Sequence, residues 1–306
     1  MKHYLIISFI TAAFCACQYQ QSLYPEYVGE KRCPVEVSFD WSDCPEAAPQ
    51  SMSLYLFPAD GSHYTRHEFS GRDGGQIFIS PGYYAAVAVN SDNEQIKVIN
   101  EGIPDSFRLV LRNSNALSSV STQSGEDEQI CPAPGPLWIA WISQVEISDD
   151  RLIVKMSEAF CRCSVDVRRI TNPEVVRSVR AVLSGTNSAL SFDGSMYESV
   201  PVSLLFDFDP VGSDGSVAGH LLTFGHCGVG RTRASAALSH RMTLEFTLGD
   251  GSTRYKTVDV TDQVHTQPIE HCHLVIDSMT VPLNVSDSGI DLTVSDWNEV
   301  DLMINL

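Results

Sequence analysis

The chain has 306 residues, 43% of them hydrophobic, and a formal net charge of −18. This length is sufficient for two ordinary hydrophobic cores. The chain carries 20 lysines and arginines against 38 acidic residues. This balance argues against nucleic acid as a partner, because binding a phosphate backbone needs an excess of basic side chains. The excess of acidic side chains keeps the surface solvated and does not indicate a particular ligand.

The first predicted element is an export signal over residues 1–16. Lys2 and His3 precede an apolar run over residues 4–14, and small residues and cysteines close the segment. This run is too short to cross a bilayer, which takes roughly twenty residues. A short basic start followed by a short apolar core is typical of a secretory signal. No later stretch is long and apolar enough to predict a second anchor.

The end of the signal resembles the lipobox of bacterial lipoproteins, in which signal removal leaves a lipid-bearing cysteine at the N-terminus. Cys17 fits this role better than Cys15, because the small Ala16 precedes it, although Phe14 departs from the usual leucine. We predict lipidation of Cys17 and a tether over residues 17–32 that attaches the chain to the outer membrane, facing the cell surface. An ordinary cleaved signal is the alternative.

Alternation of apolar and polar residues dominates the chain after the tether. From Val35 to Trp41, every second residue is apolar, which predicts a half-buried strand. Similar short runs occur at 54–57, 76–79, 84–89, 95–99, 107–111, 152–156, 163–170, 202–208, 220–224, 242–248, 255–260 and 273–276. Asp-Gly dipeptides, which suit hairpin turns, lie at 60–61, 73–74, 193–194, 214–215 and 250–251. Together these features predict an all-β fold of antiparallel β-sandwiches.

A change in composition predicts a domain boundary. Residues 113–136 combine serines, glycine and an acidic triplet with a proline-rich end, and such a segment buries little apolar surface. We predict one β-sandwich over 33–112, a linker over 113–136 and a second sandwich over 137–306; a long loop within one domain is the alternative. Asn172 followed by Pro173 has the form of a helix start, although a strand fits the residues that follow equally well.

Seven cysteines follow Cys17, and their odd number excludes complete pairing within one chain. Cys33 and Cys44 flank a predicted strand and could pair across a loop, but sequence does not settle the geometry. Most of the others are interpreted as small buried apolar residues.

The sequence His271-Cys272-His273 is the most metal-like cluster. On a strand, the two histidines would point to the same face, as two metal ligands should. His226 and Cys227 could add ligands, but the spacing matches no zinc pattern, and a strand end that carries two histidines is the favoured interpretation. No G-x-S-x-G or H-E-x-x-H motif is present. We therefore predict no catalytic residues, no metal, no cofactor and no enzymatic activity.

Several motifs occur in an order that resembles one family. They are 37–41, 52–58 and 84–92 in the first half, and Leu183-Ser184-Gly185, 219–225, 248–251 and 258–264 in the second half. This order resembles the fimbrillin-like lipoproteins of Bacteroidetes, which include minor fimbrial subunits and anchors. The resemblance implies two tandem transthyretin-like or immunoglobulin-like β-sandwich domains, a lipid anchor and a role in or beside surface fimbriae. It offers no catalytic residues.

Two functional hypotheses follow. The first is a structural or assembly role as a fimbria-like subunit, anchor or tip component, whose partners are other fimbrial subunits joined by strand addition to an exposed sheet edge. Cleavage at a basic residue such as Arg32 would accompany polymerisation, and a solvated residue beside the tether is the alternative. The second hypothesis is a surface lipoprotein that binds glycans or host ligands through exposed aromatics. The candidates, which at alternating positions are more often core residues, are Tyr83, Tyr84, Trp138, Trp141 and Trp297.

Two further expectations concern the C-terminal part. Asp277-Ser278-Met279 resembles the short O-glycosylation sequon of Bacteroidetes, which would make Ser278 a modification site, and a simple turn is the alternative. Residues 299–306 alternate as a strand, either the last strand of its own sandwich or one that is offered to a neighbouring subunit. The first interpretation is favoured, because removing a strand exposes the unpaired backbone groups of its neighbour.

Overall fold

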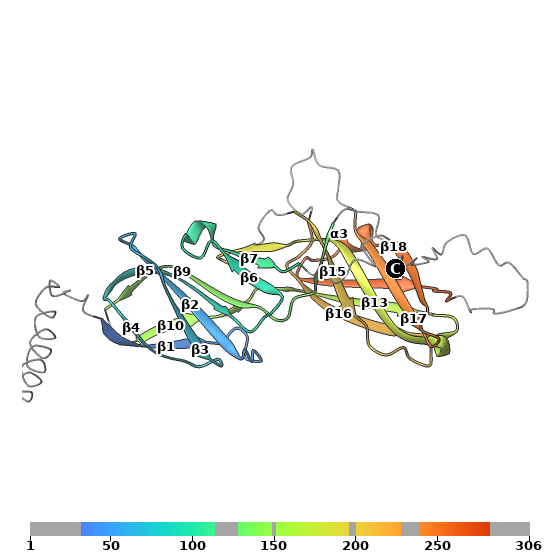
Figure 1. Cartoon of the computed structure of the whole chain (residues 1–306), viewed down its shortest axis with the longest axis horizontal. Helices are drawn as coiled ribbons and strands as arrows, with labels where there is room; N and C mark the ends of the chain where they lie inside the picture. The colour runs from blue at the N-terminus through green and yellow to red at the C-terminus, as the bar shows by residue number, and fades with distance from the viewer. Residues whose placement is uncertain (1–31, 114–127, 149–150, 196–199, 228–238, 282–306) are drawn as a thin grey trace, which may run out of the picture.

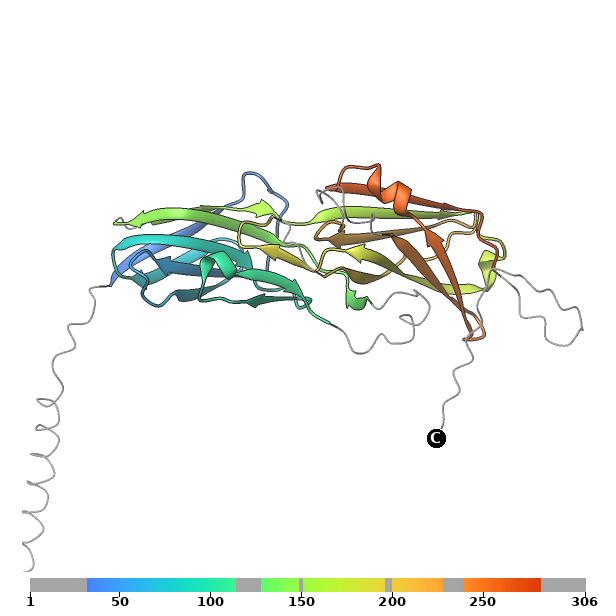
Figure 2. The same cartoon turned by 90° about the horizontal axis from the view of Figure 1, so that it is seen from above.

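The computed structural model describes residues 32–113, 128–148, 151–195, 200–227 and 239–281. Strands dominate these residues and form two lobes that lie end to end along the long axis of the molecule (Figures 1 and 2). The predicted all-β fold built of β-sandwiches is confirmed. Most strand pairs are antiparallel, and β1–β10, β8–β15 and β12–β19 are parallel. In the described part of the chain, no helix has the length and apolar character needed to cross a membrane.

The first lobe contains three sheets, with strand orders β10-β1-β4, β11-β9-β5-β2-β3 and β14-β7-β6. Its strands are β1 (Cys33–Asp40), β2 (Ser51–Pro58), β3 (Thr65–Ser70), β4 (Gly74–Ile79), β5 (Gly82–Asn90), β6 (Ile96–Ile99), β7 (Arg108–Leu111), β9 (Trp138–Ile147), β10 (Arg151–Lys155), β11 (Ser157–Glu158) and β14 (Ala189–Ser191). A single 3-10 turn, η1 (Pro104–Ser106), precedes β7.

The five-stranded sheet of the first lobe is buried on both faces. In β2, Leu54 and Leu56 contribute to the core shared with β1 and β4, whereas the alternate residues Tyr55 and Phe57 contribute to a second core that includes residues of β6 and β7. The Tyr55 and Phe107 rings lie 5.0 Å apart, edge to face. Because successive side chains of a strand point to opposite faces, a strand between two cores must be apolar almost throughout, as β2 is.

The second lobe is a sandwich of two sheets, with strand orders β16-β12-β19 and β18-β17-β13-β15-β8. Its elements are β8 (Gln129–Pro132), β12 (Cys161–Arg168), β13 (Val176–Thr186), β15 (Val202–Asp207), β16 (Val217–Thr223), β17 (Arg241–Leu248), β18 (Thr253–Asp259), β19 (His271–Asp277), the 3-10 turn η2 (Pro173–Val175) and the short helix α3 (Thr261–His265). Val165, Leu204 and Phe246 are fully buried in its core.

The strand pairing differs from the predicted boundaries 33–112, 113–136 and 137–306. β9, expected to open the second sandwich, pairs with β5 of the first lobe, and β10 runs parallel to β1. β8, inside the expected linker, pairs with β15 of the second lobe, and β14 returns to pair with β7. The physical reason is backbone hydrogen bonding, because without these partners the edges of β5 and β1 would carry unpaired N–H and C=O groups.

The predicted helix start is a turn that leads into a strand. Asn172 adopts a left-handed conformation with φ of 56°, and η2 is one 3-10 turn. The eleven-residue strand β13 follows at once, in agreement with the strand alternative.

Four of the five Asp-Gly dipeptides form turns as predicted, and Gly74 of the fifth opens β4. At Asp60-Gly61 the glycine has a φ of 79°, and the aspartate Oδ1 accepts a hydrogen bond from the backbone N–H of Ser62 at 2.9 Å. The same turn recurs at 193–195, 214–216 and 250–252. Gly74 has a different role: its φ is 100°, and a Cβ there would lie 2.2 Å from the carbonyl oxygen of Val37. Only glycine therefore allows β4 to approach β1 this closely.

Candidate functional site

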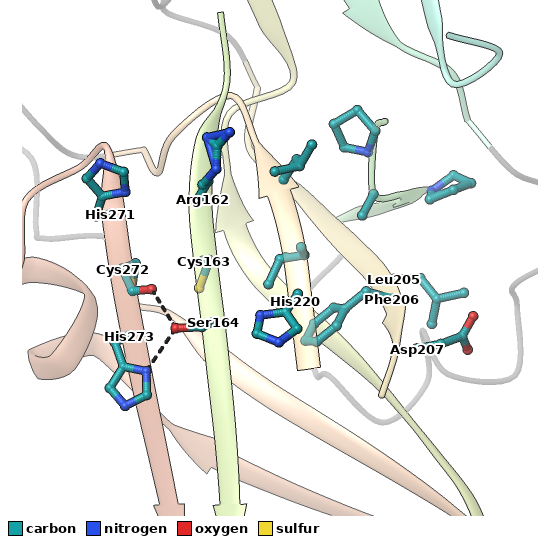
Figure 3. Close-up of a pocket in the computed structure, with 15 residues that line it drawn as sticks. Arg162, Cys163, Ser164, Leu205, Phe206, Asp207, His220, His271, Cys272 and His273 are labelled. Carbon is teal, nitrogen blue, oxygen red and sulfur yellow. Dashed lines mark hydrogen bonds between the residues drawn. The ribbon is translucent and has the colours of Figure 1, made fainter. Parts of the chain in front are cut away.

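A groove of about 850 Å³ lies on the second lobe (Figure 3). Five short segments line it, and we call it the C-lobe groove: 132–134, 162–164, 205–207, 220–222 and 271–273. They belong to β12, β15, β16, β19 and the end of β8 with the two residues that follow it. The groove therefore joins the outer face of the three-stranded sheet to the edge of the five-stranded sheet.

In the part of the chain that the structure describes, β15 and β16 share no ladder, and the backbone contact between them lies at the residues just after β15. An isolated bridge joins Phe208 to Gly219. A Cβ on Gly219 would lie 2.9 Å from the Phe208 ring, so the glycine lets this ring cover the strand. Beyond the bridge, within the described residues, β16 pairs only with β12. The outer edge of β16 near Leu222 is thus open to the groove.

The outer face of β12 and β19 carries a polar array. The Ser164 hydroxyl lies 2.8 Å from Nδ1 of His273, its register partner, and Nε2 of His273 lies 3.6 Å from the carboxylate of Asp166. These residue types occur in hydrolases, but acyl transfer also requires free N–H donors that stabilise an oxyanion. The backbone groups of β12 serve two neighbouring strands, β16 and β19. The array is a polar, solvent-facing surface of the groove.

The His271-Cys272-His273 segment forms most of β19's contribution to the groove. His271 and His273 are exposed on one face, as predicted for alternate residues of a strand, and Cys272 packs against the core. In the described ranges, no set of three or more His, Cys, Asp or Glu side chains is arranged to hold a metal ion. The two histidines instead extend the polar surface of the groove.

A pair of thiols lies beneath this surface. Cys163 of β12 and Cys272 of β19 are register partners on adjacent parallel strands (Figure 3). The two thiols share a hydrogen bond, and this bond together with burial raises the pKa of Cys163. Accepting the hydrogen bond from Cys163 lowers the pKa of Cys272. Sequence analysis missed this pair, because only the strand register brings the two residues together.

Cys33 and Cys44, whose pairing the sequence left open, have thiols with different partners. The Cys33 thiol donates to the carbonyl of Ile79 at 3.3 Å, whereas the Cys44 thiol donates to the carbonyl of Met156 at 3.7 Å. Both cysteines are free. Cys44, Cys131 and Cys163 are buried, as expected for small apolar residues, whereas the other four cysteines after Cys17 are half-buried, so the expectation of mostly buried cysteines holds for three of seven.

Three histidines cluster at the end of the second lobe that carries α3. The centroid of the His226 ring lies 5.4 Å from that of His240 and 5.6 Å from that of His265. Nε2 of His240 lies 3.0 Å from Nε2 of His265. Both ring nitrogens of His226 are buried, with no hydrogen-bond partner among the described residues. Burial, followed by the neighbouring His240 and His265, lowers the pKa of His226 to about 4.

Of the predicted attachment and processing residues, Arg32 lies near the start of the first lobe. Cys17 falls outside the described residues. Arg32 is exposed just before β1 and lines a second pocket, of about 530 Å³, together with Phe78 and Tyr83. The side chains of Phe78 and Tyr83 are 57% and 49% exposed.

The other aromatics proposed for ligand binding are mostly structural. Trp138 packs edge to face on Trp41 with ring centroids 6.0 Å apart, and the ring of Trp141 lies 4.3 Å from that of Phe192. Tyr84 is buried, and its hydroxyl donates to a backbone carbonyl. Trp297 falls outside the described residues, and so do residues 299–306.

Ser278 is exposed at the end of β19 and adopts a left-handed conformation with φ of 61°. Its hydroxyl accepts a hydrogen bond from Arg169 at 2.9 Å. O-glycosylation of Ser278 stays a prediction.

The fold and the groove define a class of two-lobed β-sandwich proteins. Within this class, the family described as a domain of unknown function, DUF5119, matches residues 16–207, more than half of the chain. The chain belongs to this family.

A curated relative is the putative fimbrium anchoring subunit Fim4B of Bacteroides ovatus, which is 20% identical over 122 residues. The match covers 40% of this chain and 35% of that protein, so the chain spans about a third of the relative's length. Together with the family match, this similarity confirms the predicted resemblance to fimbrillin-like proteins.

Two solved structures are also similar. A putative adhesin from Bacteroides ovatus has a TM-score of 0.54 and 19% identity, over 81% of this chain and 94% of that chain. This likeness shows the fold. The fimbrial anchor protein Mfa2 from Porphyromonas gingivalis has a TM-score of 0.47 and 16% identity, over 80% of this chain and 91% of that chain.

Proposed function

We propose that this chain is a non-enzymatic cell-surface protein of a fimbria-like assembly, acting as an anchor or a subunit. The observation that carries this proposal is the similarity to a protein described as a fimbrium anchoring subunit. The two-lobed β-sandwich fold and the predicted export signal over residues 1–16 support it, because a surface assembly is built from exported, stable domains.

Attachment to the outer membrane is proposed to occur through a lipid on Cys17. The tether over residues 17–32 then leads directly into β1 of the first lobe. Retention of Cys17 distinguishes an anchor, whereas cleavage at Arg32 would release the chain and distinguish a polymerising subunit. Sequencing the N-terminus of copies isolated from sheared surface filaments separates these two forms.

The proposed partner is an extended strand of another fimbrial subunit, docked in the C-lobe groove. The outer edge of β16 offers backbone groups that an added strand can pair with. Leu205 and Leu222 lie partly buried beside this edge and would contact alternate apolar side chains of the incoming strand. His220, which is exposed on β16, would contact its polar residues.

Photo-crosslinking in cells tests this docking. A photoreactive amino acid placed at Leu222 should link the chain to another fimbrial protein. The matched control places it at Ile153 of β10, which is 54% exposed on the first lobe. Equal crosslinking from both positions, or none from Leu222, would remove the groove from the proposal. Absence of the chain from filaments and from their bases would remove the fimbrial role itself.

A second candidate function is glycan or host-ligand binding. Phe78 and Tyr83 carry it, because two large exposed aromatic side chains line one pocket beside Arg32. Aromatic faces stack on the apolar faces of sugars. Glycan-array binding that is lost in a Tyr83→Ala variant, but kept in a Tyr64→Ala variant outside that pocket, would favour this function over the structural one.

A further inference from the structure

We propose that Cys163 and Cys272 form a disulfide by exchange after export, and that the bridge fastens β19 to β12. Nothing in the fimbrial role requires this bond, and the inference rests on the second lobe alone. The two residues are register partners on adjacent parallel strands (Figure 3), and the pKa of each thiol responds to the other.

The strand geometry suits a bridge. Neighbouring strands of a sheet lie ~4.8 Å apart, and disulfides join residues whose Cα atoms are roughly 4.4–6.8 Å apart. Register partners on adjacent parallel strands also point their side chains to the same face of the sheet. Cys163 and Cys272 therefore need little backbone movement to pair.

Cys161 provides an internal comparison. It lies two residues before Cys163 on β12 and thus on the same face of the strand. Its register partner on β16 is Thr223, and the paired residues of β19 begin opposite Arg162. Within the described pairing, Cys161 has no cysteine across from it. A bridge set by register should consequently include Cys163 and exclude Cys161.

The chemistry is two successive thiol–disulfide exchanges with a protein disulfide donor of the cell envelope. Cys272, the more exposed thiol of the pair, loses its proton and attacks one donor sulfur, which breaks the donor S–S bond and forms a mixed disulfide. The Cys163 thiol then loses its proton and attacks the Cys272 sulfur. The donor leaves as a dithiol that carries both protons, and the two cysteine sulfurs are bonded. The hydrogen bond from Cys163, which lowers the pKa of Cys272, favours this order.

The disulfide would attach a strand at the edge of its sheet to the central strand of that sheet. Among the described strands, β19 is one of the two edge strands of its sheet, and β12 is the central strand. The chain between the two cysteines contains β13, β15 to β18 and α3, which make up most of the second lobe, together with β14 of the first lobe. Closing so long a loop greatly reduces the conformational entropy of the unfolded chain. The disulfide also prevents β19 from leaving the sheet.

The test uses the full-length chain, purified from the cell envelope after acid quenching and blocked with N-ethylmaleimide. We expect a peptide pair linked through Cys163 and Cys272, lacking two hydrogens and free of the blocking group. Cys161 and Cys227 should carry the blocking group. Two outcomes would overturn the proposal: blocking of both Cys163 and Cys272 even after incubation with oxidised glutathione, or a link that includes Cys161.

Thermal unfolding of the wild-type chain, with and without reductant, gives a second measurement. Reduction with dithiothreitol should lower the melting temperature of the wild-type chain by roughly 5–10 °C. A Cys161→Ser variant should show the same decrease, and a Cys272→Ser variant should show none. An equal response of the wild-type and Cys272→Ser chains to reduction would contradict the proposed bridge.

Discussion

Acidification should destabilise the second lobe through His226. Burial, with smaller effects from His240 and His265, lowers the pKa of this imidazole from its ordinary value of 6.5 to about 4. In the unfolded chain His226 takes up a proton near its ordinary pKa, whereas in the folded chain it stays neutral down to about pH 4. Between these values the unfolded state binds more protons, so the free energy of unfolding falls as the pH falls. Above pH 6.5 the contribution of His226 is constant.

The size of the effect follows from the same two values. Each pKa unit corresponds to about 1.4 kcal/mol, so the difference between 6.5 and about 4 gives an upper limit of roughly 3 kcal/mol. His226 is only partly buried, and the neighbouring His265 is exposed, so solvent screening reduces this value. We expect a loss of about 1–2 kcal/mol between pH 7 and pH 4.

Urea unfolding at pH values from 7.5 to 4 measures this loss, with His226→Leu as the comparison. Both proteins contain the other titrating groups, including the partly buried His67, whose pKa burial also lowers. Their effects cancel in the difference between the two proteins. At pH 7 the variant should be about as stable as wild type, because both nitrogens of His226 lack partners among the described residues. At pH 4.5 the variant should be the more stable protein. A difference that stays constant over this pH range would refute the reasoning.

Four further predictions test the anchor, the lobes and the backbone. Cys17→Ala should abolish metabolic palmitate labelling and release the chain from the membrane, and unchanged labelling would contradict the lipid assignment. A fragment of residues 33–113 should aggregate or remain unfolded by circular dichroism, because it lacks the β9 partner of β5; a folded fragment would show that the first lobe does not need β9. Gly74→Ala should lower the free energy of unfolding by about 2–4 kcal/mol, measured in urea, since the new Cβ meets the Val37 carbonyl; an unchanged midpoint would refute this contact. Deleting 299–306 should lower the melting temperature of the isolated monomer, whereas unchanged melting with loss of entry into filaments would identify a donor strand.

The strands were predictable wherever one face is buried and alternation is regular. The run from Val35 to Trp41 and the Asp-Gly turns were sufficient to predict an all-β fold. Pairing was not predictable, since alternation reports which face of a strand is buried but not which strand lies beside it. The residues of β9 therefore fit the opening of a second sandwich as well as they fit the edge of β5.

Only those features of the candidate site that depend on neighbouring residues in the sequence could be predicted. The spacing of His271 and His273 correctly indicated a shared face. The contact between Cys163 and Cys272 depends on the register of two strands at opposite ends of the second lobe's sequence. Likewise, the histidine cluster combines the loop after β16, the residue before β17 and the last residue of α3, and no sequence spacing reveals that arrangement.

The interleaving of the lobes has a mechanical consequence for the proposed anchor. β1 begins at the end of the first lobe that lies away from the second lobe, whereas the C-lobe groove belongs to the second lobe (Figures 1 and 2). Tension between a lipid on Cys17 and a partner in the groove would therefore pass through the junction of the lobes. The junction is not a single extended linker, because β14 of the first lobe lies between β13 and β15 of the second in sequence. β13 ends at Thr186 and β14 begins at Ala189, so the link between the lobes at this point is only two residues long. Separating the lobes would therefore pull directly on β14 and load its ladder with β7, so the arrangement resists extension better than a tandem pair joined by one flexible segment.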